Sequence, residues 1–161
     1  MPLASSAYEI VMAVHIMAVV IAFGVVFAYP IMFTVAARTD PSSMPLMHRI
    51  EYTIERYLVN PALLVVLLAG IYLASDAHHW SEFFVQWGLG AVIVIGALVG
   101  SVMIPTAKRA EETARRDVAA IAAGAGAMSD EYTKLVRRLS TVGGLLNGLV
   151  LVTILLMVIK P

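Results

Sequence analysis

The sequence contains no cysteine among its 161 residues. This absence excludes disulfides, iron–sulfur clusters, covalently attached c-type haem and any thiol nucleophile. Charged residues are also scarce, at 14% of the chain, whereas hydrophobic residues make up 60% and the mean hydropathy is +0.87. An ordinary soluble domain has about 25% charged residues. The composition therefore predicts a membrane protein.

Long apolar runs occupy most of the chain. A helix that crosses a bilayer needs about 20 predominantly apolar residues, and four runs reach or approach this length. The predicted spans are 8–37, 57–76, 82–106 and 138–159. Because little chain is left over, we predict an all-α fold, an antiparallel bundle of four transmembrane helices that forms one integral membrane domain over residues 1–161.

Positive charge is distributed unevenly along the chain. Ten of the eleven Lys and Arg residues lie between the first and second spans or between the third and fourth, and only Lys160 lies elsewhere. Connections rich in Lys and Arg stay on the cytoplasmic side of a membrane. We therefore predict a bacterial inner-membrane protein with both termini outside, in the periplasm, and with long cytoplasmic extensions of helices two, three and four. These basic segments meet lipid headgroups and do not indicate nucleic-acid binding.

One histidine, His15, interrupts the first apolar run. Ionisable side chains at hydrocarbon depth are rare and usually functional, and imidazole is a common ligand of haem and of metal ions. Ala18 and Ala22 share the helical face of His15 and leave a shallow groove, which fits either a neighbouring helix or the edge of a porphyrin. Gln86 is predicted to lie at about the same depth. His15 is therefore a candidate haem or metal ligand, and the alternative is a hydrogen-bonded histidine within the bundle.

Small residues recur at helical spacing in the last two spans. Gly96 and Gly100 are four residues apart, and Gly144, Asn147 and Gly148 share one helical face. Helices in lipid associate through small residues and polar contacts. We expect these faces to point into protein, where they either pack the bundle or line a seam or pathway between copies of the chain.

An amphipathic segment from Met47 to Leu58 precedes the second span. His48, Glu51 and Glu55 fall at offsets of zero, three and seven on its polar face, a spacing that would suit a divalent ion. The simpler interpretation is a solvated polar face at the inner membrane surface.

Several signals predict where helices bend, end and begin. Pro30 and Pro61 predict kinks in the first and second spans. The Gly- and Ala-rich run 123–127 predicts the end of the third helix. Ser129, followed by two acidic residues, predicts the N-cap of the fourth helix.

The order of motifs resembles that of a bacterial family of uncharacterised, predicted integral membrane proteins. The matching features are the early histidine of the first helix, Asn60-Pro61-Ala62 to Gly70-Ile71-Tyr72-Leu73, Asp130-Glu131-Tyr132 before Arg137-Arg138, and the closing Leu156-Met157-Val158-Ile159-Lys160-Pro161. The resemblance covers nearly the whole chain and implies four helices, but that family has no assigned activity.

A more distant resemblance is to the HemJ-type protoporphyrinogen oxidases and the CopD-like membrane proteins. His15 followed by Pro30, and Pro61 followed by Gly70, are similar to the pattern of the first two HemJ helices. In HemJ-type proteins the histidine of helix one is tied to b-type haem, so the resemblance implies His15 as an axial ligand. Where that family has a functional lysine early in helix three, this chain has Gln86.

No phosphate-binding loop, nucleophile elbow or HExxH pattern is present, so the sequence does not predict an enzyme. The leading hypothesis is a haem-b-binding or redox-accessory protein that uses His15. The alternatives are an ion or small-solute pathway formed by several copies, and an accessory subunit of a larger membrane complex. The predicted partners are the lipid bilayer and either further copies or the subunits of that complex.

Overall fold

The computed structural model describes the backbone of residues 2–160 and the side chains of residues 7–160, and this part of the chain is helical apart from short connections. The α-helices are α1 (Pro2–Gly24), α2 (Tyr29–Thr39), α3 (Met44–Ile54), α4 (Asn60–Asp76), α5 (Phe83–Leu98), α6 (Ile104–Ala122) and α7 (Asp130–Ile159). Shorter helical turns lie between them, namely η1 (Val26–Ala28), η2 (Pro41–Ser43), η3 (Glu55–Val59) and η4 (Val99–Met103).

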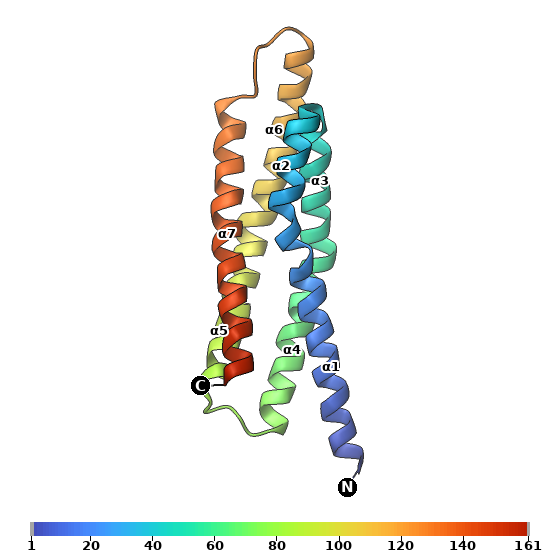
Figure 1. Ribbon diagram of the computed structural model, residues 1–161, viewed down its shortest axis with the longest axis vertical. Helices are drawn as coiled ribbons and strands as arrows, with labels where there is room; N and C mark the ends of the chain where they lie inside the picture. Colours follow the sequence, from blue (N-terminus) through green and yellow to red (C-terminus); the bar gives the residue numbers. More distant parts are fainter. Residues whose placement is uncertain (1, 161) are drawn as a thin grey trace.

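These elements form four long rods that stand side by side in a bundle (Figure 1). The rods are Ala7–Thr39, Pro41–Asp76, Phe83–Ala122 and Asp130–Ile159, and each is long and apolar enough to cross a membrane. The prediction of an all-α bundle of four long apolar helices is therefore confirmed.

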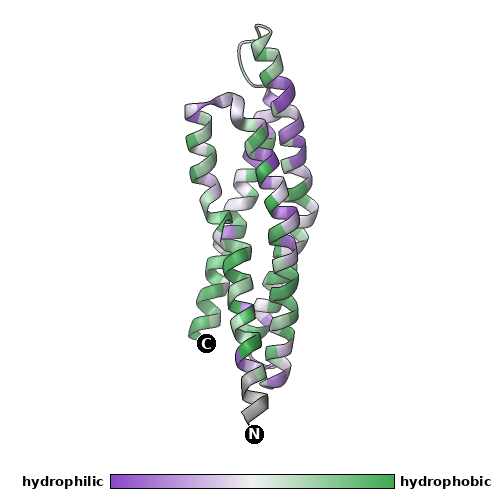
Figure 2. Cartoon of the chain, turned by 90° about the vertical axis from the view of Figure 1, so that its right-hand side faces the viewer, coloured by the Kyte–Doolittle hydropathy of each residue, from purple (hydrophilic) through white to green (hydrophobic). Residues whose placement is uncertain are grey.

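The bundle has an apolar half and a polar half (Figure 2). The apolar half comprises α1, α4, α5 and most of α7. What we call the polar half comprises α3, η3, α6 and the first turns of α7, which carry most of the charged residues, together with the largely apolar α2. The chain begins and ends in the apolar half, where the α4–α5 connection also lies (Figure 1). An even number of passes along the bundle brings both termini to the same end.

Prolines account for the interruptions within the rods. A proline lacks the backbone N–H, and its ring meets the carbonyl of the residue four positions earlier. Pro61 and Pro105 each follow a π-helical turn, η3 and η4 respectively, whose wider ring of backbone atoms leaves space for the proline. The first rod is interrupted at the 3-10 turn η1, immediately before Pro30. The predicted interruptions near Pro30 and Pro61 are thus present.

The connection between α6 and α7 is held by hydrogen bonds at the end of the polar half. The Ser129 hydroxyl accepts the N–H of Tyr132 at 3.2 Å, and Asp117 accepts both the N–H and the O–H of Ser129 at 2.8 and 2.7 Å. These bonds lower the pKa of the Asp117 carboxyl. α6 ends at Ala122, shortly before Gly124 with φ +104°. The predicted helix end and the predicted N-cap are both confirmed.

Close contacts between helices rely on alanine. Ala22 of α1 is fully buried beside Val59 and Leu63, where α1 packs on α4 and η3. Ala107, Ala110 and Ala114 of α6 are also fully buried, and α6 packs on α3 and α7. Small side chains let two backbones approach, which is the main source of helix association where lipid covers the outside.

Candidate functional site

His15 of α1 lies against α4 in the apolar half. The half-buried imidazole packs against the backbone of Gly70, where an added Cβ would lie 3.5 Å from His15 Cε1. The Nδ1 atom of His15 is buried and has no hydrogen-bond partner among the described residues. A polar atom without a partner is costly at this depth. The backbone of Val66 on α4 nevertheless adjoins the imidazole, so the predicted alternative, a hydrogen-bonded histidine within the bundle, stays a prediction.

The other residues predicted to surround a cofactor contact other parts of the protein. Ala18 and Ala22 are 6% and 0% exposed because α4 covers this face of α1. The groove therefore receives a neighbouring helix, which was one of its two predicted occupants. Gln86 is exposed and donates its amide N–H to the carbonyl of Trp80 at 3.2 Å. Its helix, α5, packs on α4 and α7.

The predicted glycine faces point away from the single chain. Gly100, Gly144 and Gly148 are exposed, and a Cβ at these positions or at Gly96 would meet nothing within 4 Å. Asn147 is half-buried at the edge of this face. The side chains that α7 buries are Tyr132, Leu139, Leu146 and Val150. These glycines do not pack the bundle, and a seam between copies stays a prediction.

The segment before the second span differs from its simpler sequence interpretation. His48, Glu51 and Glu55 are 1%, 4% and 2% exposed, so the prediction of a solvated polar face is wrong. This face is turned into the bundle, while Tyr57 and Leu58 of the same segment are exposed. The periodicity located the polar face correctly, but it carries no information on whether that face meets water or protein.

A chain of hydrogen bonds joins α7 to α3 inside the polar half. The hydroxyl of Tyr132 lies 3.1 Å from Nε2 of His48, and Nδ1 of His48 lies 3.0 Å from a carboxylate oxygen of Glu51. The ring of Phe33 covers the imidazole at a centroid distance of 4.8 Å. Burial raises the pKa of Tyr132 to about 12, so its phenol stays protonated. With a neutral His48, Tyr132 donates to Nε2 and Nδ1–H donates to Glu51.

Two more buried groups adjoin this chain. Glu55 lies one helical turn beyond Glu51 on the same face, and Tyr29 lies near both carboxylates. One oxygen of Glu55 and the hydroxyl of Tyr29 are buried without a hydrogen-bond partner among the described residues. Glu55 also begins the π-turn η3, and π-turns are frequent at functional sites. Together, Tyr29, His48, Glu51, Glu55 and Tyr132 form what we call the polar cluster.

Within the described part of the chain, no buried Lys or Arg accompanies the carboxylates, and the one buried basic side chain beside them is His48. Arg49 and Arg56 of the same rod are exposed, and Arg56 donates to the hydroxyl of Tyr52 at 3.1 Å. Lys108 and Arg109 of α6 are exposed as well. Among residues 2–160, no three His, Cys, Asp or Glu side chains come together as metal ligands. The predicted spacing for a divalent ion therefore does not become a metal site.

The two tyrosines of the polar cluster were missed at the level of sequence. Tyr29 falls within the first predicted span, and Tyr132 falls three residues after a helix cap. A sequence signal did exist, because Glu51 and Glu55 are four residues apart and so form a like-charge pair in place of an ion pair. Two carboxylates on one face, without a Lys or Arg on that face, indicate more than a solvated surface.

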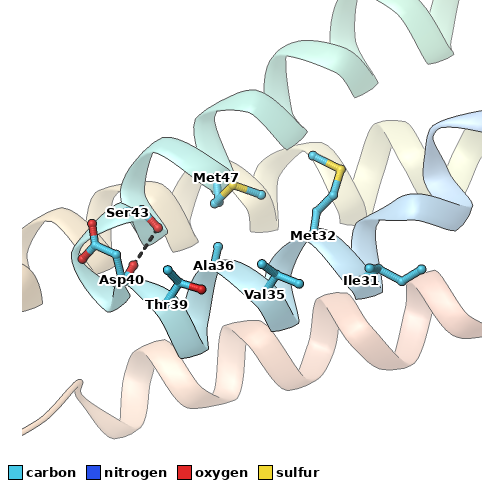
Figure 3. Close-up of a pocket in the computed structure, with 8 residues that line it drawn as sticks. All are labelled: Ile31, Met32, Val35, Ala36, Thr39, Asp40, Ser43 and Met47. Carbon is cyan, nitrogen blue, oxygen red and sulfur yellow. Dashed lines mark hydrogen bonds between the residues drawn. The ribbon is translucent and has the colours of Figure 1, made fainter.

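An open apolar groove of about 520 Å³ runs along α2 (Figure 3). Its lining residues are Ile31, Met32, Val35, Ala36, Thr39, Asp40, Ser43 and Met47. The polar groups at its end are engaged in local structure, since Ser43 donates to the carbonyl of Asp40 at 2.7 Å and the Asp40 carboxylate caps η2. The groove contains no residue of the polar cluster and offers no chemistry of its own.

Residues 9–161 match a protein family described as "Predicted integral membrane protein (DUF2269)". No curated protein and no solved structure matches the chain. The match accords with the family resemblance read from the motifs and names neither the HemJ-type oxidases nor the CopD-like proteins.

Proposed function

This chain belongs to the DUF2269 family of predicted integral membrane proteins, and for this multi-pass membrane protein we propose haem b binding through His15. The observation that supports the proposal is the unpaired, buried Nδ1 of the imidazole in the apolar half. Ionisable groups at this depth serve ligands, ions or protons more often than packing. Bound haem would supply one-electron chemistry.

The residues around His15 fit an axial imidazole but limit where a porphyrin can lie. Gly70 leaves room for the ring, and the half-buried side chain keeps part of its surface accessible. Ala18 and Ala22 are buried where α1 packs on α4, so within one chain they cannot contact the edge of a porphyrin. Gln86 is engaged with Trp80. The proposal therefore rests on His15 alone among the predicted cofactor-binding residues.

An absorption spectrum of the purified full-length protein, supplemented with haem b, tests this proposal. We expect a Soret band that His15→Ala removes, because the variant lacks the imidazole ligand. His79→Ala is the matched control, since His79 is an exposed histidine in the α4–α5 connection and should leave the band unchanged. A colourless protein after supplementation, or an equal band in His15→Ala, contradicts the proposal.

We also propose that the polar half faces the cytoplasm from a bacterial inner membrane. Ten of the eleven Lys and Arg residues lie in this half, with Arg56 of η3 included, as the positive-inside rule requires. Because the chain has no cysteine, single-cysteine variants report the orientation without background. In intact spheroplasts, an impermeant maleimide should label Ser81→Cys, and it should label Gly126→Cys only after permeabilisation. The reverse pattern contradicts this orientation.

A second candidate function is an ion or small-solute pathway formed by several copies. The outward-facing Gly144 and Gly148, with Asn147 beside them, support it, because small residues allow close approach and an amide gives a polar contact in lipid. Flux from liposomes that Asn147→Ala reduces would support this function. A monomer in mild detergent, together with no flux, would exclude it. Co-purification of other subunits would instead favour an accessory role in a larger complex.

A further inference from the structure

We propose that the polar cluster binds a proton, shared by Glu51 and Glu55, and exchanges it with water at the end of the polar half. This inference is independent of His15 and of haem, because the cluster lies in the other half of the bundle. It assigns a proton-binding site to a segment whose sequence suggested a solvated face or, from its spacing, a divalent-ion site.

The first argument is the charge of the buried carboxyl groups. Glu51 and Glu55 are 4% and 2% exposed and lie one turn apart on one helical face. Two carboxylates so placed repel each other, and each loses its hydration on burial. Glu51 has His48 as a partner, whereas one oxygen of Glu55 has no partner among the described residues. A proton is the simplest species that relieves both costs.

The second argument comes from the elements packed around the carboxyl groups. α2 contributes Tyr29, α3 contributes His48, and α7 contributes Tyr132. The buried polar residues of α6 are Thr106, Thr113 and Asp117. The basic residues of these elements near the cluster's level are exposed, namely Arg49, Arg56, Lys108 and Arg109. Among the described residues, therefore, no buried Lys or Arg neutralises the pair, and His48 contacts Glu51 alone in the recorded hydrogen bonds.

The third argument is the hydrogen-bond chain that leads to the pair. Tyr132 lies three residues after the cap Ser129, at the start of α7, where the bundle ends in the α6–α7 connection. A proton that reaches His48 Nε2 through the Tyr132 hydroxyl displaces the proton on Nδ1, which passes to Glu51 over 3.0 Å. Glu55 lies next on the same face. Only protons move in this sequence, and every heavy-atom bond stays intact.

The depth of the site agrees with a hydrogen-bond chain that runs from water at Tyr132 toward the membrane at Glu55. A hydrocarbon layer about 30 Å thick corresponds to about 20 helical residues. Counted back from Asp76, the end of α4, this length reaches Arg56. Glu55 therefore lies where the hydrocarbon layer begins, and His48 and Tyr132 lie further toward water. The cluster extends from the aqueous end of the polar half to the edge of the membrane core.

Infrared difference spectra of the full-length protein in lipid nanodiscs, recorded between pH steps, test the site directly. We expect a carbonyl band from a buried, protonated carboxyl group that shifts in D2O and disappears in Glu55→Gln. Glu112→Gln, an exposed carboxyl on α6, is the matched control and should keep the band. His15→Ala should keep it too, so failure of the haem proposal leaves this result unchanged.

Three outcomes would overturn the proposal. They are the absence of such a band at every pH, a band that persists in Glu55→Gln, and a band that Na⁺ or Ca²⁺ removes at constant pH. The last outcome would make a metal cation the ligand in place of the proton.

A second variant tests the hydrogen-bond chain without removing a carboxyl group. Tyr132→Phe deletes one oxygen and should leave the carbonyl band in place. It should slow the exchange of the carboxyl proton for deuterium by about tenfold or more, because a group that relays protons typically contributes at least that factor. Equal exchange rates in Tyr132→Phe and the parent protein contradict proton transfer through the Tyr132 hydroxyl. This measurement also serves if Glu55→Gln does not fold.

Discussion

The His48→Leu variant is expected to lose about 3 kcal/mol of folding free energy, because it leaves two buried polar groups without partners. His48 is 1% exposed and accepts or donates on both ring nitrogens, to Tyr132 at 3.1 Å and to Glu51 at 3.0 Å. Leucine fills much of the same volume, so the loss reports the missing hydrogen bonds more than a cavity. Equilibrium unfolding in mixed detergent micelles, followed by circular dichroism, measures the difference.

The companion variants separate the polar contribution from packing. The triple variant His48→Leu, Glu51→Leu and Tyr132→Phe also deletes the two polar groups that His48→Leu leaves without partners, so it should recover most of the lost stability. His79→Leu is the control, because an exposed loop histidine should change stability by no more than about 0.5 kcal/mol. If His48→Leu is as stable as the parent, or if the triple variant is no better than the single one, the cluster is not the buried network described here.

The second large effect is expected for Ala22→Leu. Ala22 is fully buried beside Val59 and Leu63, where α1 meets the second rod, and a leucine adds three carbon atoms to a contact that has no free space. Overpacking of this kind costs about 1–3 kcal/mol, and more where two helix backbones must separate. Because His15 of α1 packs against Gly70 of α4, separating these two helices should also change the position of the imidazole. Thermal unfolding in detergent measures the stability change.

Val20→Leu provides the control for this prediction. Val20 lies on the same helix but is 64% exposed, so a larger side chain there meets lipid or detergent and should have little effect. Unchanged stability in Ala22→Leu, accompanied by loss of a Soret band, would contradict the assignment of this groove to helix packing. It would instead return Ala22 to the surroundings of a cofactor.

Local signals predicted most of the helix boundaries correctly. The cap at Ser129 and the helix end before Gly124 follow from side-chain chemistry and backbone freedom within a few residues. The interruptions near Pro30 and Pro61 follow from the missing N–H of proline. The π-turns themselves were not predicted, because a helix can accommodate a proline by bending, by a 3-10 turn or by a π-turn.

The candidate sites were predicted less well, since a helical period identifies a face but not what covers it. The face of His48 and Glu51 was located and then placed in water, whereas the structure buries it. The face of Gly144 and Gly148 was expected to pack the bundle or to line a seam between copies; the single chain leaves it open, so only the seam stays a prediction. In both cases the rotation of a helix about its axis decides the outcome. That rotation depends on all the neighbouring helices together.

The sequence alone determined that this protein consists of four long apolar helices, with one histidine in the first of them and positive charge gathered in two connections. Those properties depend on composition and on spacing along one chain. The tertiary structure decided that α4 closes the groove at Ala18 and Ala22, and that two carboxyl groups meet a histidine and two tyrosines from three separate elements. Such contacts join residues far apart in sequence, so no local period could predict them.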